Sequence, residues 1–269
     1  MQAISSAAQA VRRLARQQAS SLGAYNAGLS SEAVRNRYGV TEIARLASNE
    51  NPLGASPLVQ QALSDLAQHS GIYPDPNSQA LRAEIAALTG IAPQQVVIGN
   101  GSENILEMLC LAFINPDDRV VTLLPSFGLH EIYPRMMGAE VTLVAVNQAL
   151  EFDLAAWRLA LQRPAKMVVF SNPSNPVGCM LGRDDFLQLI AAVPQDCLLV
   201  IDEAYYEYCA QPGGLPGQLG AITVTGPPVD CAAHLLQSLR AGRAARRLRS
   251  GLRCRVGDAA GPGAYAVQH

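Results

Sequence analysis

The chain has almost no lysine. Lys166 is the only one, although lysine and arginine together number 20. Any chemistry that needs a lysine amine therefore has a single candidate in this sequence. Lys166 directly precedes the apolar run 167–170, so we expect it at the N-terminal end of a strand, whereas ligands of α/β sheets bind at the C-terminal ends.

Several other features are also missing, and each absence excludes a class of protein. The six cysteines form no Cys-x-x-Cys pair and no Cys/His cluster with zinc spacing, so they indicate reduced thiols of a cytoplasmic protein with no metal site. No apolar run approaches the roughly 20 residues of a membrane span. The net charge of −2 gives no general attraction for nucleic acid.

What the sequence does contain is an alternation of apolar runs and helical stretches from about residue 41 to 210. Such runs, rich in β-branched residues and bounded by Gly, Pro and Asn, are typical of strands covered on both faces. The expected strands lie at 96–98, 120–124, 141–144, 167–170 and 198–201. The expected helices include 57–68, 78–90, 102–114, 153–162 and 184–193. This alternation predicts an α/β domain with a mostly parallel sheet.

Both ends of the chain differ from this domain. Within residues 1–40, the first 30 positions contain Arg12, Arg13 and Arg16 and several serines, but no acidic residue. That composition loosely resembles a mitochondrial transit peptide, but we favour an amphipathic arm that packs on the body or on a partner subunit. Residues 217–269 are rich in Gly, Ala, Arg and Pro, and we expect them to be a tail without strand–helix rhythm.

Four segments carry a family resemblance. They are 49–52 (Asn-Glu-Asn-Pro), 99–103 (Gly-Asn-Gly-Ser-Glu), 171–178 (Ser-Asn-Pro-Ser-Asn-Pro-Val-Gly) and 202–205 (Asp-Glu-Ala-Tyr). In this order they resemble pyridoxal-phosphate (PLP) aminotransferases of fold type I, and within these the histidinol-phosphate aminotransferases. The resemblance implies that 41–216 is part of the PLP-binding large domain, a mostly parallel sheet flanked by helices, without the small C-terminal domain.

The resemblance assigns the turn at Gly101, Ser102 and Glu103 to the phosphate of the cofactor. The turn opens a helix after the strand 96–98, and the free N–H groups and positive end of a helix suit a phosphate dianion. A Gly-x-Gly-Ser sequence also makes an ordinary tight turn, so the assignment depends on the other motifs.

Four further residues are assigned to the cofactor ring. Asp202 ends an apolar strand and resembles the aspartate that pairs with the protonated ring nitrogen, although aspartate also favours a helix N-cap. Tyr205 and Asn175 resemble the residues that contact the ring hydroxyl, although Asn-Pro is also a common turn. Phe127 resembles the aromatic residue on the ring face, where many relatives carry tyrosine; a core aromatic is the alternative.

Three residues are assigned to the entrance of the site and to the subunit contact. Asn49 and Glu50 lie in the signature near the entrance. Tyr73 resembles the tyrosine that reaches the cofactor phosphate of the neighbouring subunit, which implies a homodimer; a surface turn is the alternative. We treat His130 and Cys179 as structural, because nothing in the sequence marks them as ligands or nucleophiles.

The Schiff-base lysine of the family is absent from the expected place. The codons allowed for residues 233–250, read one base later, permit the string R-T-F-S-K-A-Y-G-L-A-G-L-R-V-G-Y-G, which resembles the family's lysine segment. The lysine then falls at Gln237-Ser238, and residues 263–269 permit V-R-T-P-F-N. We infer one inserted base near the codons of Pro216 and Gly217, which makes 217–269 an out-of-frame, disordered tail.

The expected parent activity moves an amino group between histidinol phosphate and 2-oxoglutarate in L-histidine biosynthesis, with PLP as cofactor. The chain as written is expected to be inactive, because it lacks the lysine. Three alternatives stay open: an aromatic amino-acid aminotransferase, a non-catalytic PLP-fold binding protein with a basic tail, and another α/β nucleotide-binding enzyme. The last is disfavoured because the Gly-x-Gly-x-x-Gly pattern is incomplete.

Overall fold

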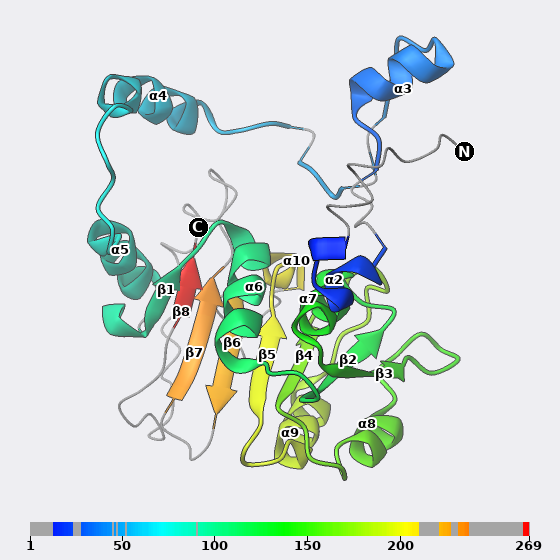
Figure 1. Ribbon diagram of the computed structural model, residues 1–269. Coiled ribbons are helices and arrows are strands. Elements are labelled where there is room, and N and C mark those ends of the chain that lie inside the picture. The colour runs from blue at the N-terminus through cyan, green and yellow to red at the C-terminus, as the bar shows by residue number, and fades with distance from the viewer. Residues whose placement is uncertain are drawn as a thin grey trace.

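The computed structural model describes residues 13–23, 28–44, 46, 48–51, 53–89 and 91–209, together with the backbone of three strands at 221–226, 231–236 and 266–268. A sheet runs through the molecule (Figure 1). Its strands are β1 (Val96–Ile98), β2 (Arg119–Leu124), β3 (Glu140–Ala145), β4 (Met167–Ser171), β5 (Leu198–Asp202), β6 (Ala221–Gly226), β7 (Cys231–Leu236) and β8 (Ala266–Gln268).

The sheet is mostly parallel, as the alternating sequence predicted. The strand order is β1-β8-β7-β6-β5-β4-β2-β3. The strand β4 pairs in parallel with β2 and β5, and β3 pairs in parallel with β2, while β6 is antiparallel to both of its neighbours. The register sets Ser171 opposite Asp202. The last residues of β4 and β5 therefore lie side by side, at the C-terminal ends of these two parallel strands.

The helices alternate with the strands over most of the chain. They are α2 (Gln17–Ser20), α3 (Ser31–Tyr38), α4 (Pro57–Leu66), α5 (Gln79–Thr89), α6 (Gly101–Phe113), α7 (Leu129–Met137), α8 (Leu154–Ala160), α9 (Arg183–Ala192) and α10 (Tyr206–Cys209), with short 3₁₀ turns at η1 (Ala67–His69) and η2 (Pro93–Gln95). None of the helices in the described part of the chain combines the length and the apolar character that crossing a membrane requires.

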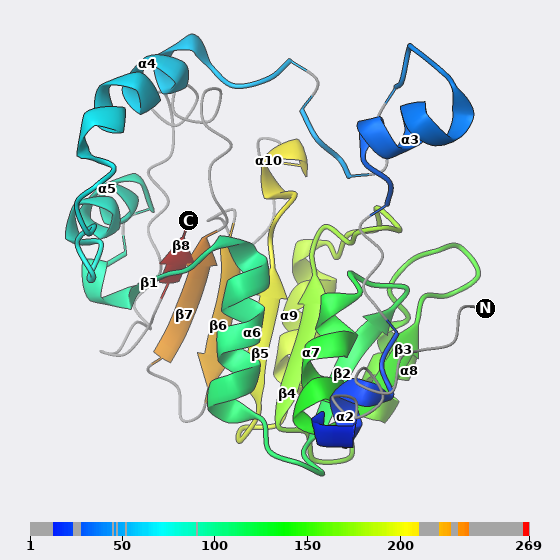
Figure 2. The ribbon, with the colours of Figure 1, turned by 45° about the horizontal axis from the view of Figure 1, so that its top comes forward.

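The helices form a layer on each face of the sheet, with α6 and α7 on one face and α8 and α9 on the other (Figures 1 and 2). Alternate residues of β2 supply the two cores, since successive side chains of a strand point to opposite faces. Val120 packs in the α6–α7 core, and Val121 packs with the fully buried Trp157 of α8. Both faces are covered, which explains why the strands are continuous apolar runs.

The helix α7 was not among the helices expected from sequence. Pro134 lies inside it and is buried, and a proline normally counts against a helix interior. The helix ends at Met137 and is capped by Gly138, whose φ of 93° is a left-handed conformation that glycine adopts without strain. This nine-residue helix packs against α6 and carries residues of the site described below.

The region after Pro216 also differs from its expected lack of strands, because β6, β7 and β8 lie there. The sequence of β6, Ala-Ile-Thr-Val-Thr-Gly, is rich in β-branched residues, which favour strands. The inferred insertion is a statement about the gene, and it stays a prediction. The remaining residues of 217–269 lie outside the described part of the chain.

The N-terminal helices α3 and α4 stand apart from the sheet, beyond its edge at the ends of β4 and β5 (Figures 1 and 2). Neither helix has a buried residue. On α4, the residues Leu58, Leu63 and Leu66 are 71%, 63% and 61% exposed. Of the expected arm at 1–40, residues 1–12 and 24–27 lie outside the described part.

Candidate functional site

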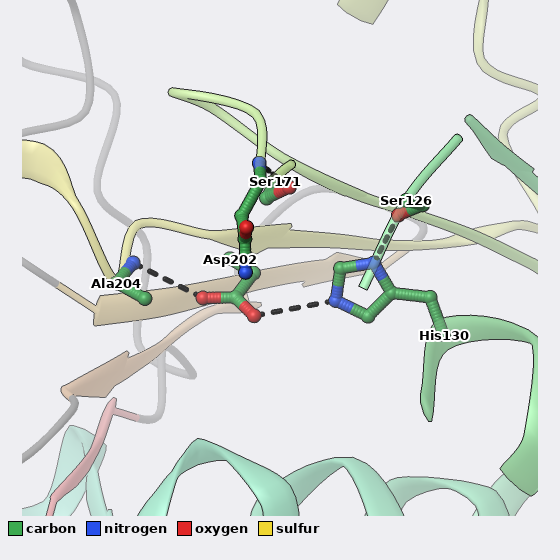
Figure 3. Close-up of polar contacts among 6 residues, drawn as sticks. Ser126, His130, Ser171, Asp202 and Ala204 are labelled. Carbon is green, nitrogen blue, oxygen red and sulfur yellow. Dashed lines mark hydrogen bonds and ion pairs between the residues drawn. The ribbon is translucent and has the colours of Figure 1, made fainter. Parts of the chain in front are cut away.

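Asp202 lies at the centre of the candidate site, at the last position of β5 and 4% exposed. Its Oδ1 accepts a hydrogen bond of 3.0 Å from the backbone N–H of Ala204, and its Oδ2 lies 3.2 Å from Nε2 of His130 (Figure 3). A buried carboxylate is costly unless it is paired in this way. Asp202 is not the N-cap of α10, because that helix begins at Tyr206.

His130 extends this network. The residue lies in the first turn of α7 and is 1% exposed, and its Nδ1 lies 2.8 Å from Oγ of Ser126. An ionised Asp202 only accepts hydrogen bonds, so the network assigns the Nε2 proton to the His130–Asp202 contact. From the sequence alone, His130 is interpreted as a structural residue. Its side chain in fact touches the carboxylate that the family resemblance assigns to the cofactor.

Phe127 lies beside this network. Its ring makes an edge contact with the ring of His130, with centroids 5.7 Å apart and planes at 86°. The side chain is partly buried and packs against the α6–α7 core. Its role on the face of a cofactor stays a prediction, since these contacts also suit a core aromatic.

The turn at the start of α6 has the geometry of an anion site. Gly101 has a φ of 83° and is the first residue of the helix, followed by the buried Ser102 and by Glu103 in the first turn. The N–H groups of a first helical turn have no partner within the helix. The N-cap Asn100 is different, because its N–H donates to Oδ1 of Asn104 at 2.9 Å. Within the described part of the chain, the N–H groups of Gly101, Ser102 and Glu103 are therefore the backbone donors that this turn offers to a phosphate.

The residue before this turn must be small. A Cβ at Gly99 would collide with Cδ1 of the buried Ile105 and would lie 3.0 Å from Cε of Met108. We predict that Gly99→Ala lowers the free energy of unfolding by about 1–3 kcal/mol, the usual cost of overpacking. Chemical denaturation measures the change. Gly71→Ala is the matched control, since a Cβ there meets nothing within 4 Å; equal losses in the two variants would contradict the packing argument.

The structure brings two predicted site residues together across 156 positions of sequence. Nδ2 of Asn49 donates a hydrogen bond of 3.0 Å to the hydroxyl oxygen of Tyr205. Tyr205 follows Asp202 by three residues, so this bond ties the segment between α3 and α4 to the end of β5. Asn175 is fixed to the end of β4, because its N–H donates to Oγ of Ser171 at 3.2 Å.

Two predicted residues lie at the surface. Glu50 is exposed, and Tyr73 is 97% exposed. Neither position tests the expected roles, because those roles involve a substrate and a second subunit.

Lys166 lies away from the site, as expected. It precedes β4, where its N–H donates to the carbonyl of Arg119 at 2.8 Å and its own carbonyl accepts from Leu198 at 2.9 Å. It lies five positions before Ser171, the last residue of β4, which is roughly 16 Å at the rise of a strand. The single lysine therefore lies at the N-terminal ends of the parallel strands, whereas Asp202 lies at their C-terminal ends.

Three cysteines whose side chains the structure describes, Cys110, Cys179 and Cys197, are not set up as nucleophiles. Burial raises the pKa of the Cys110 and Cys197 thiols to about 12, and burial is also the main cause that raises the pKa of Cys179. A thiol is reactive as the thiolate, which these pKa values disfavour near neutral pH. The candidate chemistry therefore centres on Asp202 and its neighbours.

Comparison with known proteins identifies the family. The family model described as aminotransferase class I and II matches residues 41–239. The chain belongs to this family. The match begins at residue 41, runs past Pro216, where the expected domain ended, and includes all the residues that the family resemblance assigns to the cofactor.

The curated relatives of this aminotransferase chain include two from rhizobia. Histidinol-phosphate aminotransferase 3 of Rhizobium meliloti (strain 1021) is 42% identical over 211 residues, which is 78% of this chain and 57% of that protein. Histidinol-phosphate aminotransferase 1 of Mesorhizobium japonicum is 45% identical over 184 residues, 68% of this chain and 50% of that protein. The chain thus spans about half the length of the curated relatives it matches.

A solved aminotransferase structure has the same fold. The histidinol-phosphate aminotransferase from Sinorhizobium meliloti, in complex with pyridoxal-5'-phosphate, superimposes with a TM-score of 0.67 at 27% identity, covering 74% of this chain and 53% of that one. The prediction of a PLP fold type I large domain is therefore confirmed, and so is PLP as the cofactor of the family.

Sequence reasoning missed His130 and Ser126 in this site. Ser126 follows β2 and its cis Leu124-Pro125 bond, and His130 comes four residues later on α7. Ser126 contacts His130, and the contact of His130 with Asp202 spans 72 positions, so no local signal in the sequence reveals it.

Proposed function

We propose that the chain holds PLP at the ends of β4 and β5 and derives from a histidinol-phosphate aminotransferase, which transfers an amino group to 2-oxoglutarate. The observation that carries this proposal is the buried, hydrogen-bonded carboxylate of Asp202. A carboxylate at a strand end, fixed by His130 and by Ala204, is a preformed partner for a protonated pyridine nitrogen. The names of the relatives support the choice of substrate.

Each predicted residue has a distinct task in this proposal. When bound, PLP supplies an electron sink for the carbon that loses its proton. The carboxylate of Asp202 holds the ring nitrogen protonated, and the ring of Phe127 covers one face. The hydroxyl of Tyr205 and the amide of Asn175 orient the ring hydroxyl. The N–H groups at Gly101 to Glu103 hold the phosphate.

The chain as written binds the cofactor in this proposal but does not turn over substrate. The proton-transferring amine of the family is a lysine at the site, and Lys166 faces the other edge of the sheet. The parent enzyme is a homodimer in which Tyr73 reaches the partner subunit. The 97% exposure of Tyr73 and the exposed leucines of α4 are typical of a surface that a second copy of the chain covers.

The test is a PLP titration of the full chain, followed by borohydride reduction and peptide mass spectrometry. We expect saturable binding, seen as a change in cofactor absorbance, and no pyridoxyl adduct on Lys166. Because the chain has one lysine, Lys166→Arg is a complete control for side-chain adducts. An absence of saturable binding would refute the proposed site, and a stoichiometric adduct on Lys166 would show that the cofactor lies elsewhere.

A further inference from the structure

One helix contacts two separate parts of the candidate site. The helix α7 carries His130, which faces Asp202, and three residues later it carries Tyr133. The hydroxyl of Tyr133 donates a hydrogen bond of 3.1 Å to Oε1 of Glu103. Glu103 lies in the first turn of α6, among the N–H groups assigned to the phosphate. The Tyr133–Glu103 bond therefore connects α7 to the phosphate turn.

The environment of Tyr133 fixes its hydroxyl as the donor. Its ring is partly buried and packs against the α6–α7 core, in the cluster that also holds Ile105. Burial, and next the hydrogen bond and charge of Glu103, raise the pKa of Tyr133 above its usual value. The hydroxyl thus keeps its proton near neutral pH, and the packed ring limits where that proton can point.

The carboxylate of Glu103 would oppose phosphate binding unless its side chain is held away from the N–H groups of the turn. A carboxylate in the first turn of a helix is attracted to the same unpaired N–H groups that would bind a phosphate. It also repels the phosphate, because both groups are negative. A hydrogen bond to Tyr133 satisfies the carboxylate on the α7 side, which leaves the backbone donors for the ligand.

We propose that Tyr133 is a positioning residue of the phosphate site, which holds the carboxylate of Glu103 against α7 and so keeps the N–H groups from Gly101 to Glu103 free for the cofactor phosphate. This inference rests on the proposed function, since it assumes that PLP binds at the turn. It concerns one hydroxyl group, so Tyr133→Phe removes the bond and keeps the packed ring.

The experiment measures the affinity of the full chain for PLP and for pyridoxal, which lacks the phosphate. We expect Tyr133→Phe to weaken PLP binding about tenfold, the scale of one hydrogen bond to a charged group, and to change pyridoxal binding less than twofold. The double variant Tyr133→Phe/Glu103→Gln should bind PLP as well as Glu103→Gln does, because the unheld charge is gone. Circular dichroism verifies that each variant is folded.

The outcomes separate this inference from the proposed function. If the unaltered chain fails to bind PLP, the proposed function falls and the inference falls with it. If the chain binds PLP and Tyr133→Phe binds it equally well, the inference alone is overturned. Equal losses for PLP and pyridoxal, or no recovery in the double variant, would show that Tyr133 only supports the fold, and would overturn it too.

Discussion

Deleting one base near the codons of Pro216 and Gly217 is expected to turn a product without measurable transamination into an active aminotransferase. The shifted frame permits a lysine at Gln237-Ser238, where the family resemblance requires one. Proton transfer by a positioned amine contributes about 10²–10⁴-fold to a rate. Lys166 cannot replace that lysine, because Lys166 lies roughly 16 Å along the strand from the end of β4. We therefore expect a rise of at least a factor of about 10².

The measurement is the amino transfer from histidinol phosphate to 2-oxoglutarate by the two gene products. A frame-restored gene in which the new lysine codon is replaced by one for arginine is the control, and it should remain inactive. Resequencing the gene across the same codons tests the inference at its source. Transamination by the 269-residue product at a rate within tenfold of the frame-restored product would contradict both the inactivity of this chain and the need for the lysine.

The central part of the fold could be predicted from the sequence for a simple physical reason. The central strands β2, β4 and β5 are buried almost throughout, so each is a continuous apolar run that ends at polar or turn-forming residues. The strands β1 and β3 are less buried but have the same β-branched character. The observed bounds differ from the expected ones by at most one residue at either end. For β5 the extra residue is Asp202 itself, because the strand extends by one residue into the site.

The contacts within the site were less accessible to prediction. The family resemblance placed Asn49 and Tyr205 in one site, but the hydrogen bond between them joins residues 156 positions apart. Likewise, His130 and Tyr133 carry no motif of their own. They were missed because their roles depend on α7, a helix whose Pro134 argues against it locally and whose packing against the sheet and α6 stabilises it.

Replacing Asp202 with alanine is expected to weaken PLP binding by a factor of about 10² or more. Removing one partner of a buried charged pair costs about 3–5 kcal/mol, and the cofactor would lose the carboxylate that holds its ring nitrogen protonated. His130 would lose its 3.2 Å contact, and the N–H of Ala204 its 3.0 Å acceptor. A titration of the variant followed by cofactor absorbance measures the loss.

Two further variants decide whether charge or shape is responsible. Asp202→Asn keeps the size of the side chain and an oxygen that can accept from Ala204, but it has no negative charge, so we expect it to lose most of the affinity as well. Asp184→Ala is the matched control, because Asp184 is an exposed acid in the first turn of α9. There it stabilises the helix by only about 0.3–1 kcal/mol. If Asp202→Asn binds PLP as tightly as the unaltered chain, the carboxylate is a structural cap of the strand end, and the ring nitrogen does not bind at Asp202. If both Asp202 variants lose affinity and Asp184→Ala does not, the charge at the end of β5 is what recognises the cofactor.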